Sequence, residues 1–225
     1  MKLGSPRIHH RRTGSTNAEA RTLAHAGAPH GTLVTAAEQT AGRGREGRRW
    51  LAPPGSALLC SLVLRDVPPL ASLRAGVAVA DALAADALLK WPNDVLIDGL
   101  KVAGILVEGR PQERWAVLGI GLNVALAVED LPVALRDRAG TLGLEPAAIE
   151  PVLAALLRAL ERWLAADVAA VLAAVRQRDA LLGRRVSWAG GVGEAAGIDD
   201  RGRLLVATGR GQTALDSGEV HLGWG

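Results

Sequence analysis

The sequence predicts an α+β protein with a larger N-terminal domain, residues 1–182, and a small β domain, residues 183–225. Up to about residue 182, strand-like hydrophobic runs are mixed with segments of helical spacing. From Gly183 onward, short β-like runs are interrupted by glycine every few residues, which is typical of a small β-barrel. The 225 residues are 49% hydrophobic, enough for one sizeable core and a small second domain.

Helices and strands alternate at the start of the larger domain. The stretch "STNAEARTLAHAG" predicts a helix from about Asn17 to a C-cap at Gly27, because Thr16 and Glu19 have capping-box spacing. On this interpretation the side chains of Ser15, Thr16 and Asn17 only cap the helix. The runs "TLVTAAE" and "ALLCSLVL" predict two core strands, and "PPLASLRAGVAVADALAAD" predicts a helix with one apolar face.

A hairpin is predicted in "LLKWPNDVLIDGLKVAGILVEG", where two β-branched runs flank Asp98-Gly99. This places Asn93 and Asp94 near one end of the hairpin and Lys101 early on its return strand. The run "RWAVLGIGLNV" predicts another strand, and the alanine-rich residues 146–182 predict two helices.

Composition and charge limit the classes of function. The formal net charge is only +3, from 26 Lys and Arg against 23 Asp and Glu, which argues against a protein that coats DNA. The single cysteine, Cys60, excludes an intramolecular disulfide, indicates a reducing compartment, and is interpreted as a small buried hydrophobic residue. No secretion signal and no apolar run of about 20 residues is present, so we expect a cytoplasmic protein without a membrane segment.

The stretch "QTAGRGREGRRW" places four arginines among three glycines between two predicted strands. Exposed glycine N–H groups and guanidinium groups bind anions, although the spacing is not that of a P-loop. These residues alone leave two interpretations open: a basic loop that is only solvated or contacts RNA nonspecifically, or a site for a small anion. Phe and Tyr are absent, so aromatic stacking on a ligand must use one of six tryptophans.

Two further segments carry candidate polar groups. Pro92 restricts its neighbours, so that Asn93 and Asp94 either shape a turn or are presented by it to a ligand. Lys101 lies among apolar residues, where a charge needs a partner unless the side chain extends to solvent. Glu108 lies seven residues further on, on the opposite face of a regular strand, and is an unsuitable partner unless a bulge intervenes.

The segment "GIGLNV" lacks the third glycine of a dinucleotide-binding fingerprint and the helix that should follow it. We therefore expect Gly119 and Gly121 to allow a ligand to approach the backbone closely, with Asn123 as a polar contact beside it.

Each of these segments is weak evidence, but their order is specific. Together, "STN", "QTAGRGREGRRW", "KWPNDV", "LKVAGILVE" and "GIGLNV" resemble the biotin protein ligases, and "GEAAGIDDRGRLLV" with "SGEV" resembles the SH3-like C-terminal domain of that family. The resemblance implies a catalytic domain related to class II aminoacyl-tRNA synthetases. Because "STN" begins at Ser15, we expect the monofunctional type without an N-terminal DNA-binding domain.

The resemblance also implies a reaction and its residues. Biotin and ATP give biotinyl-5′-AMP, and a lysine of the biotin carboxyl carrier protein then accepts the biotin. Magnesium is expected with ATP, no metal ligand is assigned, and the family often forms homodimers. The implied catalytic residues are Lys101, Arg45 and Arg48. The implied biotin-binding residues are Ser15, Thr16, Asn17, Gln39, Arg43, Gly44, Arg45 and Lys101, and the implied ATP-binding residues are Arg48, Trp50, Asn93, Asp94 and Asn123.

Two other functions compete with this interpretation. A lipoate or octanoate ligase or transferase would share the catalytic fold and a similarly placed lysine, but it differs in the arginine loop and in "WPND". A nucleic-acid-binding module would use the basic loop and the β domain, but the near-balanced charge and the absence of Phe and Tyr argue against it.

Overall fold

A computed structural model describes residues 2–83, 86–216, 218 and 220–222. Residues 84–85, near the end of one predicted helix, and Ser217 and Glu219 of "SGEV" lie outside the described residues. The N-terminal part contains a seven-stranded sheet in the order β1-β2-β3-β7-β6-β5-β4. Its strands are β1 (Arg7–His10), β2 (Leu33–Ala36), β3 (Ala57–Arg65), β4 (Leu88–Lys90), β5 (Asp94–Ile97), β6 (Leu100–Arg110) and β7 (Trp115–Asn123). The β1–β2 pair is parallel and the other neighbours pair antiparallel, so the sheet is mixed.

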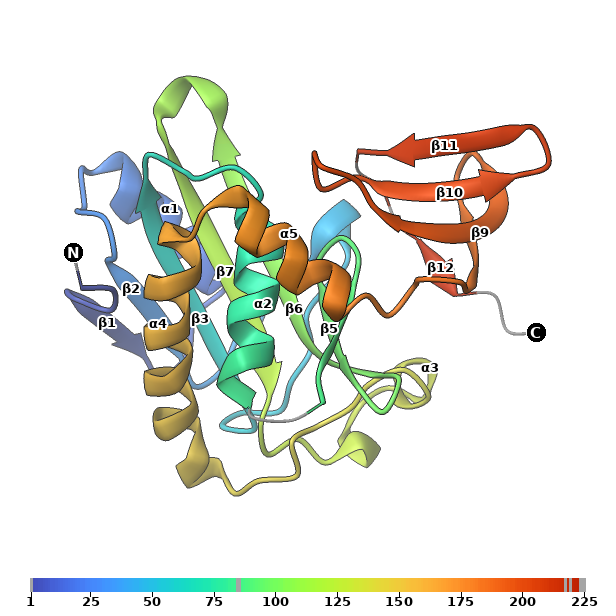
Figure 1. Ribbon diagram of the computed structural model, residues 1–225. Coiled ribbons are helices and arrows are strands. Elements are labelled where there is room, and N and C mark those ends of the chain that lie inside the picture. Colours follow the sequence, from blue (N-terminus) through green and yellow to red (C-terminus); the bar gives the residue numbers. More distant parts are fainter. Residues whose placement is uncertain (1, 84–85, 217, 219, 223–225) are drawn as a thin grey trace.

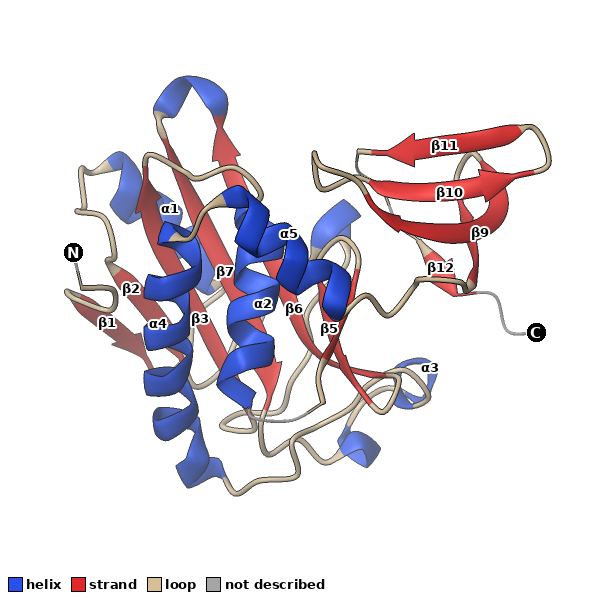
Figure 2. Ribbon diagram, viewed as in Figure 1, coloured by secondary structure: helices blue, strands red, loops and turns tan. Residues whose placement is uncertain are grey.

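Helices cover both faces of this sheet (Figures 1 and 2). One face packs on α1 (Thr16–His25), and the other on α2 (Ala71–Leu83), α4 (Ile149–Ala165) and α5 (Val168–Gln177). The shorter helices are α3 (Val133–Arg136), η1 (Arg45–Gly47), η2 (Pro111–Glu113), η3 (Val128–Asp130) and η4 (Pro146–Ala148). Within the described residues, none of the helices is long and apolar enough to cross a bilayer.

The two-residue period of the strands divides their side chains between the two faces. In β3, Leu58, Leu62 and Leu64 belong to the core beneath α2 and α4, whereas Val63 packs with Ala20 of α1. Alternate residues of the central strands therefore face α1, and these residues shape the candidate site.

The second sheet consists of β8 (Arg185–Trp188), β9 (Gly191–Ile198), β10 (Leu204–Thr208), β11 (Gly211–Leu215) and β12 (His221–Leu222). These strands pair antiparallel in the order β11-β10-β9-β8-β12, and this C-terminal antiparallel sheet confirms the α+β class. Trp91 Nε1 donates a hydrogen bond to the Gly202 carbonyl at 3.0 Å, and Arg176 Nε donates to the Ile198 carbonyl at 2.8 Å. These contacts connect the turn before β5 and helix α5 with the second sheet and its β9–β10 turn.

The structure corrects the predicted start of α1. The helix begins at Thr16 with Ser15 as N-cap, and the Ser15 side chain makes no capping hydrogen bond. The Thr16–Glu19 capping box is also wrong: Thr16 Oγ1 donates to Gln39, and Glu19 accepts from Thr13 Oγ1 at 2.8 Å. Tertiary partners therefore replace the local cap.

The predicted hairpin is confirmed. Asp98 and Gly99 both have positive φ, 52° and 78°, as a tight two-residue turn between antiparallel strands requires. Lys101 pairs with Leu96 and Ala103 pairs with Val95, so Val102 is an extra residue in β6 and forms a bulge. Because of this extra residue, Leu100 and Lys101 lie on the opposite faces of the sheet from those that a regular strand would give them.

Arg74 of α2 is a structural cation in the core between the helices, with only 3% of its surface exposed. Its guanidinium donates to the carbonyls of Pro69, Trp163 and Ala166 at 2.7 Å. The last two lie at the C-terminal end of α4, where helix carbonyls lack intrahelical donors. Burial lowers the pKa of Arg74, but the carbonyl contacts supply the charge with partners.

We expect Arg74→Met to destabilise the fold by about 3 kcal/mol, because it leaves buried carbonyl groups without donors. Equilibrium urea denaturation measures this loss. Arg158→Met, on the exposed face of α4, is the matched control and should change the free energy of unfolding by less than about 0.5 kcal/mol. Equal effects of the two substitutions would contradict the role given to Arg74.

Candidate active site

A cleft of about 590 Å³ opens on the face of the sheet that carries α1. It lies between the arginine–glycine loop, strands β6 and β7, and the segment 131–139, and β12 of the second sheet contributes His221 and Leu222. All the residues that the sequence proposed for the site line it together: Ser15, Thr16, Asn17, Gln39, Arg43, Gly44, Arg45, Arg48, Trp50, Asn93, Asp94, Lys101 and Asn123. These residues come from segments separated by up to about a hundred positions.

Glycines form the floor of the cleft. Gly119 and Gly121 lie two residues apart on β7, on the face toward α1. A Cβ atom at Gly119 would lie 2.0 Å from Asn17 Oδ1, and one at Gly121 would lie 2.5 Å from the Trp50 indole. The groups that approach the backbone at these glycines are side chains of the protein itself, Asn17 and Trp50, and not a ligand as the sequence suggested.

A buried polar network occupies the Gly119 end of the cleft. Gln39 Oε1 accepts from the Thr16 backbone N–H at 2.7 Å and from Thr16 Oγ1 at 3.0 Å. Ser61 Oγ lies 2.8 Å from Thr16 Oγ1 and 2.6 Å from Asn17 Oδ1, with its one proton available to either. These contacts orient the side chains of Thr16, Asn17 and Gln39 toward the cleft. The interpretation of Thr16 and Asn17 as helix caps only is therefore wrong.

Sequence reasoning missed Ser61. It is fully buried in β3, in the run "ALLCSLVL" that was predicted to be a core strand. The period of the strand places Ser61 beside Val63 on the α1 face, away from Leu62. The signal available in the sequence was a single hydroxyl group inside "ALLCSLVL".

The arginine–glycine loop folds back on itself as a narrow hairpin. Gly44 N donates to the Arg48 carbonyl at 2.7 Å, and Trp50 N donates to the Gly42 carbonyl at 3.0 Å. The short η1 helix forms its tip, where Glu46 has a positive φ of 54°. The hairpin brings Trp50 back over the sheet.

Three arginines of the loop have different partners. Arg43 Nη1 lies 3.3 Å from Glu108 Oε1, and Arg45 Nη1 donates to Asn93 Oδ1 at 3.4 Å. Arg49, which the sequence left without a role, donates to the Thr40 carbonyl at 2.7 Å and so holds the base of the loop. Contacts of Arg43 and Arg45 therefore connect the loop to β6 and to the turn before β5.

Lys101 pairs with Asp94 across the hairpin, with 2.6 Å between Nζ and Oδ1. The lysine side chain is 34% exposed and its Nζ lies 5.7 Å from the centre of the Trp50 ring. The bulge at Val102 brings Lys101 to the face that carries Gly104, the face toward the cleft. Of the two alternatives left open for Lys101, a partner for its charge is present, and it is the carboxylate of Asp94.

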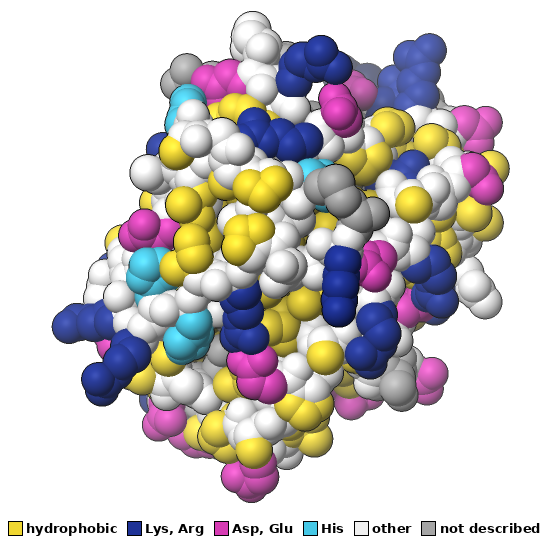
Figure 3. Space-filling model, turned by 90° about the vertical axis from the view of Figure 1, so that its left-hand side faces the viewer, with side chains coloured by type: hydrophobic (Ala, Val, Ile, Leu, Met, Phe, Trp, Pro, Cys, Tyr) yellow, Lys and Arg dark blue, Asp and Glu magenta, His cyan; other side chains and the backbone are white. Residues whose placement is uncertain are grey.

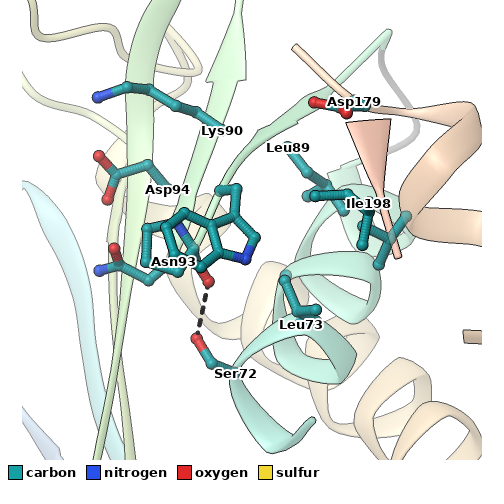
Figure 4. Close-up of a pocket in the computed structure, with 12 residues that line it drawn as sticks. Ser72, Leu73, Leu89, Lys90, Asn93, Asp94, Asp179 and Ile198 are labelled. Atoms are coloured by element: carbon teal, nitrogen blue, oxygen red, sulfur yellow. Dashed lines mark hydrogen bonds between the residues drawn. The ribbon is translucent and has the colours of Figure 1, made fainter. Parts of the chain in front are cut away.

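The "WPND" turn is fixed by contacts on several sides. Ser72 Oγ of α2 donates to the Pro92 carbonyl at 3.1 Å (Figure 4). Asn93 Nδ2 donates to the Ile105 carbonyl at 2.9 Å, which leaves Asn93 Oδ1 for Arg45. In Figure 4 the side chains of Asn93 and Asp94 extend away from α2. The turn shapes the backbone and also presents its side chains to the cleft.

Three buried polar atoms of the lining have no hydrogen-bond partner within the described part of the chain: Trp50 Nε1, Asn123 Oδ1 and Asp94 Oδ1. Asp94 Oδ1 has the ion pair with Lys101 instead, which leaves Trp50 Nε1 and Asn123 Oδ1 without a polar contact among the described residues. The Asn123 amide is held by its Nδ2, which donates to the Gly140 carbonyl at 2.8 Å. Because buried polar groups usually have partners, these two atoms are candidates for ligand contacts.

Cys60 is 2% exposed, and burial raises the pKa of its thiol to about 12. At neutral pH the group is a neutral thiol and a poor nucleophile. This agrees with the prediction of a small buried hydrophobic residue.

The polar network, the Trp50–Lys101 pair and Asn123 follow one another along β7. The neutral network lies at Gly119, Trp50 and Lys101 lie at the paired glycines Gly121 and Gly104, and Asn123 follows at the end of the strand. Residues two apart in a strand are separated by about 6–7 Å. The cleft is therefore suited to an elongated ligand with a neutral polar end, an anionic centre near Lys101 and an aromatic ring.

Comparisons with known proteins agree with this arrangement. The model of the biotin/lipoate A/B protein ligase family matches residues 10–124, and the chain belongs to this family. The model of the biotin protein ligase C-terminal domain matches residues 181–223, which include the second sheet. The match to both domains identifies the chain as similar to biotin protein ligases in particular.

Individual relatives support the same conclusion. The chain is 40% identical to the biotin--[acetyl-CoA-carboxylase] ligase of Mycobacterium tuberculosis, over 93% of this chain and 86% of the relative. It is 34% identical to the bifunctional ligase/repressor BirA of Bacillus subtilis, over 98% of this chain and 75% of the relative. The structure of the Aquifex aeolicus biotin protein ligase in complex with biotin and ATP superposes with a TM-score of 0.82 at 28% identity, covering 97% of this chain and 98% of that one.

The buried thiol gives a direct test of the site's packing. At pH 8 we expect Cys60 to resist iodoacetamide in the native protein, because a pKa of about 12 leaves only about one thiol in ten thousand ionised. Intact-mass spectrometry should show full alkylation in urea over the same period. Equal labelling of the native and unfolded proteins would contradict the burial of Cys60.

Proposed function

We propose that this protein activates biotin with ATP to form biotinyl-5′-AMP and then transfers biotin to a specific lysine of the biotin carboxyl carrier protein. The observation that supports this best is the convergence of the polar network, Lys101 and the loop arginines in one cleft. The relatives named as biotin--[acetyl-CoA-carboxylase] ligases support the same reaction.

The first step joins two anions. A carboxylate oxygen of biotin forms a bond to the α-phosphorus of ATP, and the bond to pyrophosphate breaks. Lys101, held beside the cleft by Asp94, neutralises the repulsion between carboxylate and phosphate and meets the charge that develops at phosphorus. Arg45 and Arg48 share this role, with Arg48 on the phosphates of ATP.

The two ends of the cleft take the rest of the adenylate. The ureido ring of biotin binds Ser15 and the neutral network at Thr16, Asn17 and Gln39, together with the loop backbone at 43–45. Trp50 stacks on adenine, and the remaining nucleotide contacts come from Asn93, Asp94 and Asn123. In the second step the amine of the carrier lysine attacks the acyl carbon of biotin, and AMP leaves.

Magnesium is expected to arrive with ATP. Among the described residues, no group of three His, Cys, Asp or Glu side chains could hold a metal ion, and the cleft carboxylate of Asp94 is paired with Lys101. Phosphate oxygens and water would therefore supply most of the ligands, as is usual for magnesium bound to nucleotides. Homodimer formation, which rests on the family resemblance, and cytoplasmic location, which rests on the single cysteine and the lack of a long apolar run, also belong to this proposal.

The same family includes lipoate ligases, so an octanoate or lipoate substrate is the second candidate. The match of residues 181–223 to the biotin protein ligase C-terminal domain favours biotin. A nucleic-acid-binding module is less favoured. On the face shown in Figure 3, basic and acidic side chains are interspersed with hydrophobic ones and form no single basic surface.

Mass spectrometry of a carrier domain incubated with this protein and ATP tests the function. We expect a mass increase of one biotinyl group when biotin is supplied, and none when lipoate or octanoate replaces it. Modification with lipoate or octanoate and none with biotin would overturn the proposal in favour of the second candidate.

We expect Lys101→Ala to reduce biotin-dependent ATP–pyrophosphate exchange by at least about a hundredfold, because one preorganised charge is lost. Lys2→Ala, on an exposed residue remote from the cleft, is the control and should retain full exchange. Circular dichroism verifies that both variants are folded. Near-normal exchange in Lys101→Ala would remove this lysine from the reaction.

Arg45→Gly should weaken retention of the adenylate, because the contact between the loop and Asn93 is lost with one cation of the cleft. The released adenylate acylates nearby amines, so we expect several-fold more biotin on a bystander protein such as serum albumin, measured by streptavidin blot. Arg11→Gly, on an exposed arginine outside the cleft, should behave as wild type. Unchanged bystander labelling in Arg45→Gly would contradict this role.

A further inference from the structure

Glu108 lies where the substrate pocket and the arginine–glycine loop meet, yet it is outside the set of residues to which the reaction gives a role. It is on β6, on the same face as Gly104, and its side chain is 20% exposed. One carboxylate oxygen, Oε2, accepts from Asn17 Nδ2 at 2.8 Å. The other oxygen, Oε1, lies 3.3 Å from Arg43 Nη1. Glu108 thus contacts both parts of the site.

The contact with Asn17 is the shorter of two that hold the amide of that residue in one orientation; in the longer contact, Asn17 Nδ2 donates to the Leu106 carbonyl at 3.5 Å. An ionised carboxylate only accepts hydrogen bonds, so it requires the NH₂ group of Asn17 to face Glu108. Asn17 Oδ1 then faces Ser61, whose hydroxyl lies 2.6 Å away. Asn17 is 4% exposed and packs against the backbone at Gly119, so the amide has little room to turn in another way.

The contact with Arg43 connects the loop to the sheet. Arg43 and Arg49 form a bridge at the base of the loop hairpin, so a tether at Arg43 acts on the whole hairpin. Arg21 of α1 is at 4.0 Å from the same oxygen and adds positive charge on that side. Because the Arg43 and Glu108 side chains are 45% and 20% exposed, this ion pair is weak enough to open and close.

We propose that Glu108 is a positioning residue that orients Asn17 for the biotin head group and, through Arg43, holds the loop closed over the adenylate. This role rests on the proposed biotin-activating function. It has two separable parts, because one contact needs a hydrogen-bond acceptor and the other needs a negative charge. Glu108→Gln keeps the acceptor for Asn17 but loses the negative charge that faces Arg43, whereas Glu108→Ala loses both.

Steady-state pyrophosphate exchange tests the orientation of Asn17. We expect Glu108→Ala to raise the KM for biotin by about tenfold with kcat changed less than about twofold, as for a loss of uniform binding. Glu108→Gln should restore the KM to within about threefold of wild type, because its amide oxygen still accepts from Asn17. Equal KM values for the two variants, or a fall in kcat with KM unchanged, would overturn this part.

Dissociation of preformed radiolabelled adenylate tests the tether. Glu108→Gln and Arg43→Met should each release the adenylate several-fold faster than wild type, and the double variant should release it no faster than the faster single variant. Glu150→Gln is the control, because it removes a different Arg–Glu ion pair, with Arg7 at 2.6 Å, outside the cleft. It should change neither the KM for biotin nor the rate of adenylate release. An unchanged release rate in Glu108→Gln, or additive effects in the double variant, would contradict the tether.

Different results would overturn the proposed biotin-activating function and the proposed role of Glu108. A wild-type protein without biotin-dependent exchange would overturn the proposed function, and the role of Glu108 with it. An active wild type with normal KM and normal adenylate release in folded Glu108→Gln and Glu108→Ala would overturn the role of Glu108 alone. Thermal melting establishes folding, and Glu108→Gln preserves the shape of the side chain if Glu108→Ala does not fold.

Discussion

The site depends on the absence of side chains at Gly119 and Gly121 on one face of β7. In the central strands that face is filled by Val63 and Val117 further along, where α1 packs on the sheet. At the two glycines the space is taken instead by Asn17 and Trp50, which approach the backbone more closely than any Cβ atom would allow. The two-residue period of the strand therefore places a hollow beside a helix–sheet interface, and the binding residues surround that hollow.

Electrostatics determine how this hollow is used. The cleft gathers Lys101 with Arg43, Arg45 and Arg48 from segments far apart in the chain. Carboxylates moderate this charge at two points, Asp94 for the lysine and Glu108 for Arg43. Both pairs are partly exposed, so an anionic ligand can compete for the cations at modest cost. An adenylate provides such a ligand, because its negative charge lies between two neutral or aromatic ends.

Much of the fold could be predicted from local sequence. The Asp98-Gly99 pair strongly favours a two-residue hairpin turn, and the strands and helices follow from hydrophobic period. The partners of the polar side chains were harder to predict from the sequence. The capping box of Thr16 failed because Gln39 and Ser61 lie within reach only after β2 and β3 pair. The bulge at Val102 likewise depends on the register with β5, and it determines that Lys101 faces the cleft.

The sequence by itself determined the kinds of group in the site and their order along the chain. The "STN", arginine-loop, "WPND" and lysine segments could be recognised because each contains residue types with restricted uses, such as glycine beside arginine or proline before asparagine. Only the tertiary structure decided the partnerships: Asp94 with Lys101, Ser61 with Asn17, and Glu108 with both Asn17 and Arg43. Hydrogen bonds and ion pairs act over about 3–4 Å, and only the folding of the sheet brings residues separated by up to 91 positions within that distance.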